Sequence, residues 1–340
     1  MITLRDLSQQ LGVSTATISN ALTGKGRMRP EKRQEILETA IAMGYDIRNA
    51  QIRHRVKTIY LLVEQMNIYF LTNIIDSFCE AAEDAEANVL IYDLNLIPKF
   101  KTIAPDNFRV RDIVRPVLNR IAGSASGIVY LSQYTRDLSG ILPKTPIPTI
   151  VVYGYTNEGR TSINYDDASG AYLATEHLIH LGYRKIAMIS GPIDSIPMTK
   201  RLAGYQRALI DGGLSFDPRL IQLGDWMVAS SYASARQLLS LEDPPDALFC
   251  QNDAMAVGAM RALNDLGLRV GHDVGIVGFD NESMCDYITP TLTSIAPPFE
   301  DMGRKAFEIL WNMMGTNNAM PESIKLPCRL VVRESSQMIG

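Results

Sequence analysis

A short polar segment near the amino terminus carries side chains that can contact both phosphates and base edges. Residues 14–20 read Ser-Thr-Ala-Thr-Ile-Ser-Asn and follow Gly12 after a single valine. Hydroxyl and carboxamide groups of this kind donate to phosphate oxygens and hydrogen-bond to bases in a duplex groove. Basic side chains lie beside the segment, at Lys25, Arg27, Arg29, Lys32 and Arg33. Their charge favours a polyanionic partner, because phosphate contacts supply much of the affinity for DNA.

Short helices must position this segment. Apolar residues at helical spacing predict helices over 4–11, 15–22 and 30–43. Gly12 ends the first helix in a tight turn, and Ser14 is a suitable N-cap for the second. Two short helices joined in this way predict a helix-turn-helix. A three-helix bundle that merely packs would show the same spacing, and the neighbouring basic residues favour DNA binding instead.

The charge is divided unevenly along the chain. The formal net charge of the 340 residues is -4. Residues 1–58 contain ten Lys/Arg and five Asp/Glu, a net of +5, whereas the remainder contains 23 and 32, a net of -9. Such an asymmetry predicts one module that faces phosphates and a second module that faces something else.

Composition is typical of an ordinary globular protein. Apolar residues make up 46% and charged residues 21% of the chain. No apolar stretch is long enough to span a bilayer, and residues 1–6 lack the pattern of a signal peptide, so we expect a cytoplasmic protein. The cysteines are far apart and are expected to be reduced core thiols: Cys79, Cys250, Cys285 and Cys328.

After a short basic linker at 48–57, strand and helix patterns alternate. Apolar runs predict strands at 59–63, 89–92, 127–131, 149–153, 185–190, 247–250 and 274–279. Helices are predicted between them, at 73–87, 170–181, 200–212, 231–241 and 254–266. Residues 98–115 show little periodicity and are not assigned. The alternation predicts an α/β body of two doubly wound parallel-sheet lobes behind the all-α head.

Enzymatic motifs are lacking in this sequence. Glycine-rich nucleotide-binding patterns and the Gly-x-Ser-x-Gly elbow are missing. His177 and His180 have no third metal ligand at a suitable spacing. Asp166 and Asp167 would point to opposite faces of a strand, which is poor geometry for acid–base chemistry. We therefore predict no catalytic site, no metal and no cofactor.

The opening segment resembles the DNA-binding head of the LacI/GalR family of bacterial repressors. The family signature Gly-Val-Ser-x-x-Thr-Val-Ser-x-x-Leu matches residues 12–22, with Ile18 in place of the second valine. The resemblance implies that Thr15, Ala16 and Asn20 contact bases. It further implies a DNA-binding set of Thr3, Ser14, Thr15, Ala16, Thr17, Ser19, Asn20, Lys25, Arg27, Arg33, Ile52, Arg53 and Val56.

Asn20 predicts an unusual operator half-site. Many members of the family have arginine at this position, and an arginine fork suits guanine. A carboxamide pairs best with the N6 and N7 atoms of adenine. Ser14, Thr17 and Ser19 fall where the family holds phosphates, so they are expected to position the helix rather than to specify sequence.

The hinge departs from the family pattern Asn-x-x-Ala-Arg-x-Leu. Residues 49–55 read Asn-Ala-Gln-Ile-Arg-His-Arg, so Ile52 replaces the alanine and Arg55 stands where the leucine would be. Either Ile52 or Val56 could be the wedge that enters the minor groove. Alternatively, the operator is not kinked, and Arg53 and Arg55 lie along a narrow groove.

The resemblance extends through the body. Segments that occur in the family's order are 163–167, 175–178, 181–184, 201–205, 252–256, 277–280, 290–293 and 332–336. They imply a body similar to periplasmic sugar-binding proteins, with two lobes, three crossovers and a ligand between the lobes. The expected organisation is a head at 1–46, a hinge at 47–58 and a body at 59–340. The N-lobe is expected at about 59–162 and 294–322, and the C-lobe at about 163–293 and 323–340.

A ligand site is expected where strands of the body end, because open parallel sheets bind ligands at their carboxyl edge. Asp280 follows such a strand and can accept hydrogen bonds from hydroxyls, while Arg201 and Asn252 supply donors. Trp226 lies where sugar-responsive relatives place an aromatic ring, and Tyr69 and Phe70 follow the first strand. The expected ligand-binding set is Tyr69, Phe70, Arg201, Trp226, Asn252 and Asp280.

Other interpretations of this site remain open. Trp226 and Phe70 could simply belong to the core, and Arg201 and Asp280 could form a structural ion pair. The effector is expected to be a sugar or sugar phosphate, with a purine or a protein corepressor as alternatives. Two chains are expected to pair through the body on a palindromic operator, since one head makes few contacts. A dimer is favoured over a tetramer because no heptad tail precedes Gly340.

Overall fold

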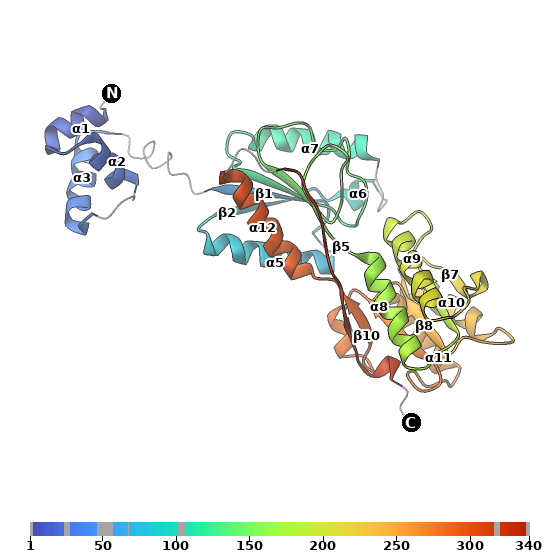
Figure 1. Cartoon of the computed structure of the whole chain (residues 1–340). Coiled ribbons are helices and arrows are strands. Elements are labelled where there is room, and N and C mark those ends of the chain that lie inside the picture. Colours follow the sequence, from blue (N-terminus) through green and yellow to red (C-terminus); the bar gives the residue numbers. More distant parts are fainter. Residues whose placement is uncertain are drawn as a thin grey trace. The chain divides into compact units, whose positions relative to one another are not determined.

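The computed structural model describes residues 3–23, 28–45, 57–66, 68–100, 106–315 and 320–337. The chain divides near Thr58 into a small amino-terminal unit, the head, and a larger unit, the body (Figure 1). Among the described residues, no helix is long and apolar enough to cross a bilayer. The cysteines Cys79, Cys250, Cys285 and Cys328 are all free thiols, as predicted.

The described part of the head is helical. Its helices are α1 (Leu4–Leu11), α2 (Thr15–Thr23) and α3 (Pro30–Ala42). Thr3 and Asp6 form a capping box at the start of α1, and Gly12 ends it with a φ of 63°. The apolar stripes of the helices share a core of Leu7, Ile18, Ala21, Leu22, Ile36 and Ala40. The predicted helix-turn-helix is therefore present, with helix ends within one residue of the prediction.

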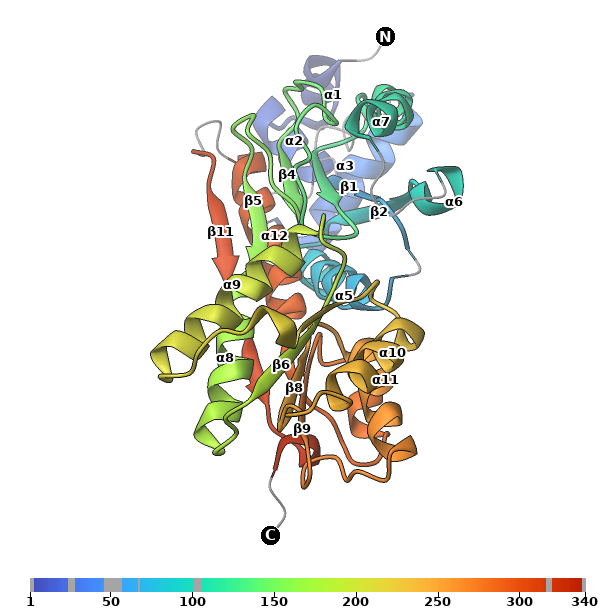
Figure 2. The same ribbon diagram turned by 90° about the vertical axis from the view of Figure 1, so that its right-hand side faces the viewer.

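The N-lobe of the body contains a six-stranded sheet in the order β11-β5-β4-β3-β1-β2. Its strands are β1 (Thr58–Val63), β2 (Asn88–Asp93), β3 (Gly127–Leu131), β4 (Thr149–Val152), β5 (Ser162–Tyr165) and β11 (Ser323–Leu326). Helices α5 (Tyr69–Asp84) and α12 (Phe299–Gly315) pack together on one face, and α7 (Asn107–Ile121) covers the other (Figures 1 and 2). Strands such as β3 are buried throughout because both faces are covered.

The C-lobe contains a second six-stranded sheet in the order β12-β10-β9-β8-β6-β7. Its strands are β6 (Ile186–Ser190), β7 (Ile221–Leu223), β8 (Ala247–Cys250), β9 (Gly275–Phe279), β10 (Thr293–Ala296) and β12 (Arg329–Val331). Helices α8 (Asp167–His180) and α9 (Ile196–Asp211) pack together, as do α10 (Val228–Leu239) and α11 (Asp253–Asp265), on the two faces (Figure 2). Strand β12 pairs antiparallel with β10, whereas β6, β8, β9 and β10 pair in parallel.

The chain passes between the lobes three times, after β5, after β10 and between β11 and β12. The lobe boundaries predicted from the sequence differ from these crossings by a few residues. Residues 163–165 belong to the N-lobe sheet, 294–296 to the C-lobe sheet and 323–326 to the N-lobe sheet. Each of these strands is only four residues long, so it left no period-2 pattern from which to locate a crossing.

Most predicted elements of the body are present with ends shifted by a few residues. The unassigned stretch 98–115 contains parts of two helices, α6 (Leu96–Phe100) and α7. Its charged exposed face and the proline inside α7, Pro116, masked the helical periodicity. The predicted helix at 73–87 begins four residues earlier, at Tyr69, because its N-cap residue is Ile68, which has no capping side chain and gave no start signal.

Candidate functional site

The first candidate site is the exposed face of α2 in the head. Thr15, Ala16 and Asn20 are exposed, whereas Ile18 on the opposite side of the helix is completely buried. The core contact of Ile18 therefore fixes the rotation of α2 and leaves the three predicted base-contacting residues accessible. This arrangement fits a helix that inserts into a major groove.

The start of α2 offers groups that suit a phosphate. Ser14 Oγ accepts a hydrogen bond from the backbone N–H of Thr17 at 3.1 Å and lies 2.8 Å from its hydroxyl. Ser8 Oγ donates to the carbonyl of Val13 at 2.7 Å and holds the turn that precedes the helix. Backbone N–H groups at a helix start and adjacent hydroxyls form a common anion site. Ser19 is half-buried.

Some predicted DNA contacts lie outside the described residues. These are Lys25, Arg27, Ile52, Arg53 and Val56. Of the remaining basic residues, Arg33 is half-buried on α3, and its buried Nε has no hydrogen-bond partner among the described residues. Thr3 is exposed, but its hydroxyl donates to Asp6 at 2.8 Å, so the structure gives it a capping contact.

The second candidate site is a buried polar network where carboxyl ends of strands from both lobes meet. Tyr165 ends β5, Gln251 follows β8, and Asp280 follows β9. Tyr153, directly after β4, has a φ of 59°, and Asp280 has a φ of 102°. Non-glycine residues rarely adopt such conformations, and they cluster at functional sites where surrounding contacts hold them.

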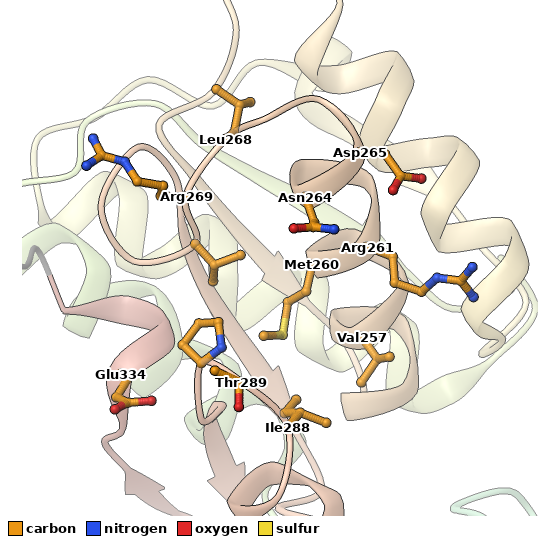
Figure 3. A pocket seen from close by; sticks show the side chains of 12 residues that line it. Val257, Met260, Arg261, Asn264, Asp265, Leu268, Arg269, Ile288, Thr289 and Glu334 are labelled. Atoms are coloured by element: carbon orange, nitrogen blue, oxygen red, sulfur yellow. The ribbon is translucent and has the colours of Figure 1, made fainter.

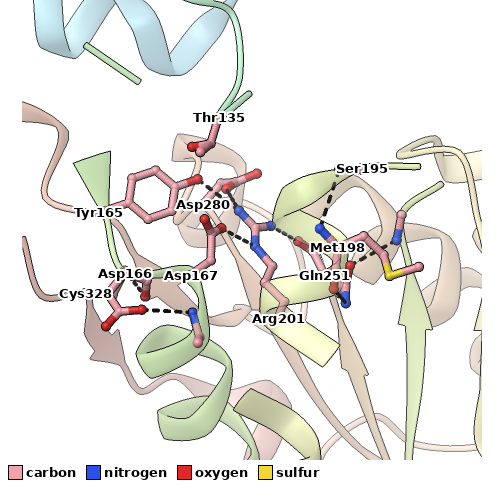
Figure 4. Close-up of polar contacts among 12 residues, drawn as sticks. Thr135, Tyr165, Asp166, Asp167, Ser195, Met198, Arg201, Gln251, Asp280 and Cys328 are labelled. Carbon is pink, nitrogen blue, oxygen red and sulfur yellow. Dashed lines mark hydrogen bonds and ion pairs between the residues drawn. The ribbon is translucent and has the colours of Figure 1, made fainter. Parts of the chain in front are cut away.

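Arg201 on α9 joins these residues. Its side chain is 3% exposed, and its Nε donates to Asp167 Oδ1 at 2.9 Å. Nη2 donates to the Tyr165 hydroxyl at 2.9 Å and lies 3.7 Å from Asp280 Oδ1, and Nη1 donates to the carbonyl of Gln251 (Figure 4). The Tyr165 hydroxyl is in turn 2.8 Å from that of Tyr153. Arg201 and Asp280 thus form an ion pair, which the sequence left open as the alternative to a ligand-binding role.

Burial controls the electrostatics of this network. It raises the pKa of Asp280 to about 6, against the opposing effect of Arg201. It raises the pKa of Asp253, the first residue of α11, to about 8, and the charge of Asp280 adds to this effect. Burial also raises the pKa of Asp167, although Arg201 lowers it. For Arg201 itself, burial lowers the pKa, but the adjacent Tyr165 and the carboxylates raise it by more, so the pKa is raised overall.

Trp226 and Asn252 border the network. The Arg201 guanidinium lies 5.8 Å from the Trp226 ring centroid, and Trp226 is half-buried with a φ of 71°. Its ring occupies the space that a side chain at Gly191 would need, which explains the glycine there. Asn252 caps α11 through the N–H of Met255 and donates to the carbonyl of Trp226 at 3.2 Å. The Asn252 amide therefore holds the backbone that carries the Trp226 ring.

Phe70 lies in an aromatic cluster on the N-lobe side. Its ring stacks on Phe299 at 5.2 Å and meets Tyr153 edge-on at 5.2 Å. Tyr165 stacks on Tyr153 at 5.4 Å, so the cluster is continuous with the polar network. Phe70 and Trp226 both make core contacts, as their alternative interpretation expected. Tyr69 begins α5, and its side chain lies outside the described residues.

Several residues of the network were not predicted as site residues. Tyr153 and Gln251 lie directly after a strand, Tyr165 ends a strand, and Asp167 lies two residues beyond the end of β5. The rule that selected Asp280, which is that ligands bind at the carboxyl edge of a parallel sheet, would have selected them too. Strand β5 was not predicted and β4 was predicted one residue too long, so Tyr165 and Tyr153 were not recognised at strand ends. Strand β8 was predicted with its observed end, and Gln251 was overlooked there.

Asp166 and Asp167 were predicted to lie on a strand, but both residues lie at the start of helix α8. Asp166 is the N-cap of α8 and accepts from the N–H groups of Ala168 and Ser169. Asp167 is the first residue of that helix and contacts Arg201. The short strand ends at Tyr165 because Asp166 satisfies the first N–H groups of the helix.

His177 is a packing residue of α8, and its Nε2 lies 2.9 Å from Ser336 Oγ. Among the described residues, no three side chains of the metal-binding types form a group that could hold an ion.

A surface pocket of about 710 Å³ lies elsewhere on the C-lobe. Apolar side chains from α11 and the loop before β10 form its floor, with charged groups at the rim (Figure 3). Among its lining residues are Val257, Met260, Arg261, Arg269, Ile288 and Glu334. None of the predicted ligand-binding residues belongs to this pocket.

Together, a helix-turn-helix head and a body of two sheets that meet in a polar network define a DNA-binding regulator with a ligand-binding module. A family model described as a periplasmic binding protein-like domain matches residues 175–336. The HTH-type transcriptional repressor PurR of Escherichia coli O1:K1 / APEC is 30% identical over 344 residues, which cover 98% of this chain and 97% of that protein. The chain belongs to the LacI/GalR family of bacterial transcription regulators.

Solved structures agree with this assignment. The Lac repressor bound to ONPG in the repressed state has a TM-score of 0.72 and 25% identity, with 98% of this chain and 99% of that chain covered. The transcriptional regulator CelR in complex with cellobiose has a TM-score of 0.66 and 25% identity, with 98% and 100% covered.

Proposed function

We propose that this chain represses transcription by binding a palindromic operator through two heads, under the control of a small molecule bound between its lobes. The observation that carries the proposal is the exposure of Thr15, Ala16 and Asn20 on a helix whose other side is anchored by Ile18. One head offers few base contacts, so specificity requires a second head on a second half-site. Two chains would therefore pair through their bodies.

In this mechanism Asn20 pairs with adenine, while Ser14, Thr17 and Ser19 hold phosphates. Lys25, Arg27 and Arg33 add sequence-independent attraction, and Thr3 lies at the amino end of α1, where a phosphate can approach. The hinge residues Ile52 or Val56 would wedge open the minor groove, or Arg53 would follow a narrow groove instead. Because operator DNA lies in the bacterial cytoplasm, we expect the protein to act there.

A sugar is the effector that the body supports best. Trp226 presents a half-buried aromatic ring beside a network of carboxylates, and these are the groups that hold sugar rings and hydroxyls in binding sites. CelR, with which this chain shares its fold and 25% identity, was solved with cellobiose. Phe70, Asn252 and Asp280 complete the proposed site, together with Arg201 and Tyr69.

The ligand would act through the relative arrangement of the two lobes. The contacts of Arg201 with Tyr165 join the lobes directly, so a molecule that enters this network must rearrange the contact. The change in operator affinity can be no larger than the differential affinity of the ligand for the two arrangements. We propose that the chain acts by binding alone, without a catalysed reaction.

Thermal unfolding of the full chain in the presence of candidate effectors tests the sugar proposal. A ligand that binds only the folded body raises its melting temperature by mass action. We expect at least one mono- or disaccharide to raise the melting temperature and to alter operator binding at the same concentration. Stabilisation by nucleobases alone would replace the sugar with a purine, and stabilisation by neither class would contradict small-molecule control by these ligands.

A further inference from the structure

We propose that the inter-lobe network accepts an uncharged or cationic ligand rich in hydrogen-bond donors and discriminates against a phosphorylated one. The inference rests on the proposed function, because it assumes that the effector binds in this network. It narrows the choice between a sugar and a sugar phosphate to the unphosphorylated sugar or an amino sugar.

Negative charge exceeds positive charge among the buried groups of the network. Asp167 and Asp253 are completely buried, and the side chain of Asp280 is 13% exposed. Among the described residues, Arg201 is the cation in contact with Asp167 and Asp280, and the charge of the half-buried Lys200 also lowers the pKa of Asp167. Even with Asp253 protonated, two carboxylates face this guanidinium, so a dianionic phosphate would add to an existing excess of negative charge.

Arg201 has little capacity left to bind a phosphate. Each of its three nitrogens already faces an acceptor, and these acceptors are Asp167, the Gln251 carbonyl, the Tyr165 hydroxyl and Asp280. One face of its guanidinium lies 3.6 Å from the ring centroid of Phe279. The planar fork that would normally bind a phosphate is therefore occupied and enclosed.

Buried acceptor atoms in the network and next to it in sequence lack donors within the described part of the chain. Asp167 Oδ2 and Asn281 Oδ1 are buried and have no hydrogen-bond partner among the described residues. Asn281 directly follows Asp280, and Figure 4 shows the carboxylates of Asp167 and Asp280 beside the Arg201 guanidinium. Unpaired buried acceptors are costly, and a hydroxyl or ammonium group can satisfy them. A phosphate dianion has only acceptor oxygens and would leave them unpaired.

The titration behaviour of the carboxylates points in the same direction. Burial, together with the charges of Glu282 and Asp167, raises the pKa of Asp280 to about 6, although Arg201 opposes this rise. A site that resists ionisation of its own carboxylates resists an added anion for the same reason. An added ammonium group would instead favour the ionised carboxylates.

Matched sets of ligands test the inference on the full chain. We would compare D-glucose, D-glucosamine and D-glucose 6-phosphate, and likewise D-ribose and D-ribose 5-phosphate, by thermal shift and titration calorimetry at constant ionic strength. In any set with a ligand that binds, the phosphate should bind at least about tenfold more weakly than its parent, and the amino sugar at least as tightly. A phosphate that binds as tightly as its parent overturns the inference and leaves sugar control standing. If neither these sugars nor any mono- or disaccharide in the thermal-unfolding screen binds, the proposed sugar control fails, and the charge preference fails with it.

Charge-removing variants locate the discrimination. The ratio of interest is the dissociation constant of the sugar phosphate divided by that of its parent sugar. Asp167→Asn and Asp280→Asn should each reduce this ratio at least about threefold, because each removes one negative charge from the network. The control is Asp84→Asn, an exposed carboxylate at the far end of α5, which should leave the ratio unchanged. Thermal unfolding establishes whether each variant folds, and one folded variant is enough to carry out the test. An unchanged ratio in a folded variant overturns the role of these carboxylates.

Discussion

The two candidate sites of this protein are built in opposite ways. The DNA-binding face takes its residues from one short helix, and the base-contacting residues Thr15, Ala16 and Asn20 are exposed. The inter-lobe network takes Arg201 and Asp280, among others, from elements far apart in sequence and buries them almost completely. A partner can therefore reach the first site without a change in the protein, whereas a ligand must rearrange contacts at the second. This difference suits a molecule in which the second site controls the first.

Removal of the central cation should have the largest effect. Arg201→Met leaves the carboxylates of Asp167 and Asp280 buried without a partner, which should lower the free energy of unfolding of the body by about 3–5 kcal/mol. Chemical denaturation measures this loss. The matched control is Arg207→Met on the same helix, whose exposed ion pair with Asp211 at 2.8 Å should contribute little because solvent screens it. Equal losses of unfolding free energy in the two variants would show that Arg201 contributes no more to stability than an exposed ion pair.

The head should unfold independently of the body when its core is weakened. Ile18→Ala creates a cavity beneath the DNA-binding face, and it should cost about 2–4 kcal/mol and abolish operator binding. The melting transition of the body should not change. Ile41→Ala, at a residue that is 66% exposed on α3, should have little effect on either property. Calorimetry of both variants checks this, and a simultaneous loss of the body's transition would contradict two independent units.

These two predictions also show what the sequence could and could not provide. The polar pattern at 14–20 is local, so helix propensity, the N-cap and the apolar stripe of Ile18, Ala21 and Leu22 identify the face directly. The inter-lobe network depends on strand ends that meet only after both sheets form. Asp280 was found because β9 is an uninterrupted run without polar side chains, but Tyr165 was missed as a site residue because Ser162 and Asn164 interrupt β5.

Substitution of Asn20 should change specificity more than affinity. Asn20→Ala removes the carboxamide that pairs with adenine, so preference at one base pair should fall by about 1–3 kcal/mol while binding to other positions persists. Binding to operator variants substituted at each position in turn measures this. Gln34→Ala on α3 serves as the control, with its side chain hydrogen-bonded to Glu38 at 3.2 Å. A uniform loss across all sequences would assign Asn20 to phosphate contact instead.

Acidification should stabilise the body by a small increment for each pH unit. Asp280 has a pKa of about 6 in the folded body, above its value in an unfolded chain, so the folded state holds a proton that the unfolded state releases. The free energy of unfolding should therefore fall as the pH rises from about 4 to 6, by about 1 kcal/mol per pH unit. Asp280→Asn should reduce this slope without abolishing it, because buried Asp253, with a pKa of about 8, contributes with the same sign. Asp84→Asn should leave the slope unchanged. A slope of opposite sign would show that the carboxylate is stabilised in its charged form.

Sequence-specific DNA binding by the exposed face of α2 is the central property proposed for this chain. Genomic fragments can be competed against an excess of random DNA at moderate salt, with the full chain as the binding protein. We predict that the chain retains a few fragments that contain an inverted repeat, and that Thr15, Ala16 and Asn20 substitutions change which fragments are retained. Retention of all fragments to the same extent as the random competitor would contradict sequence-specific DNA binding by this chain.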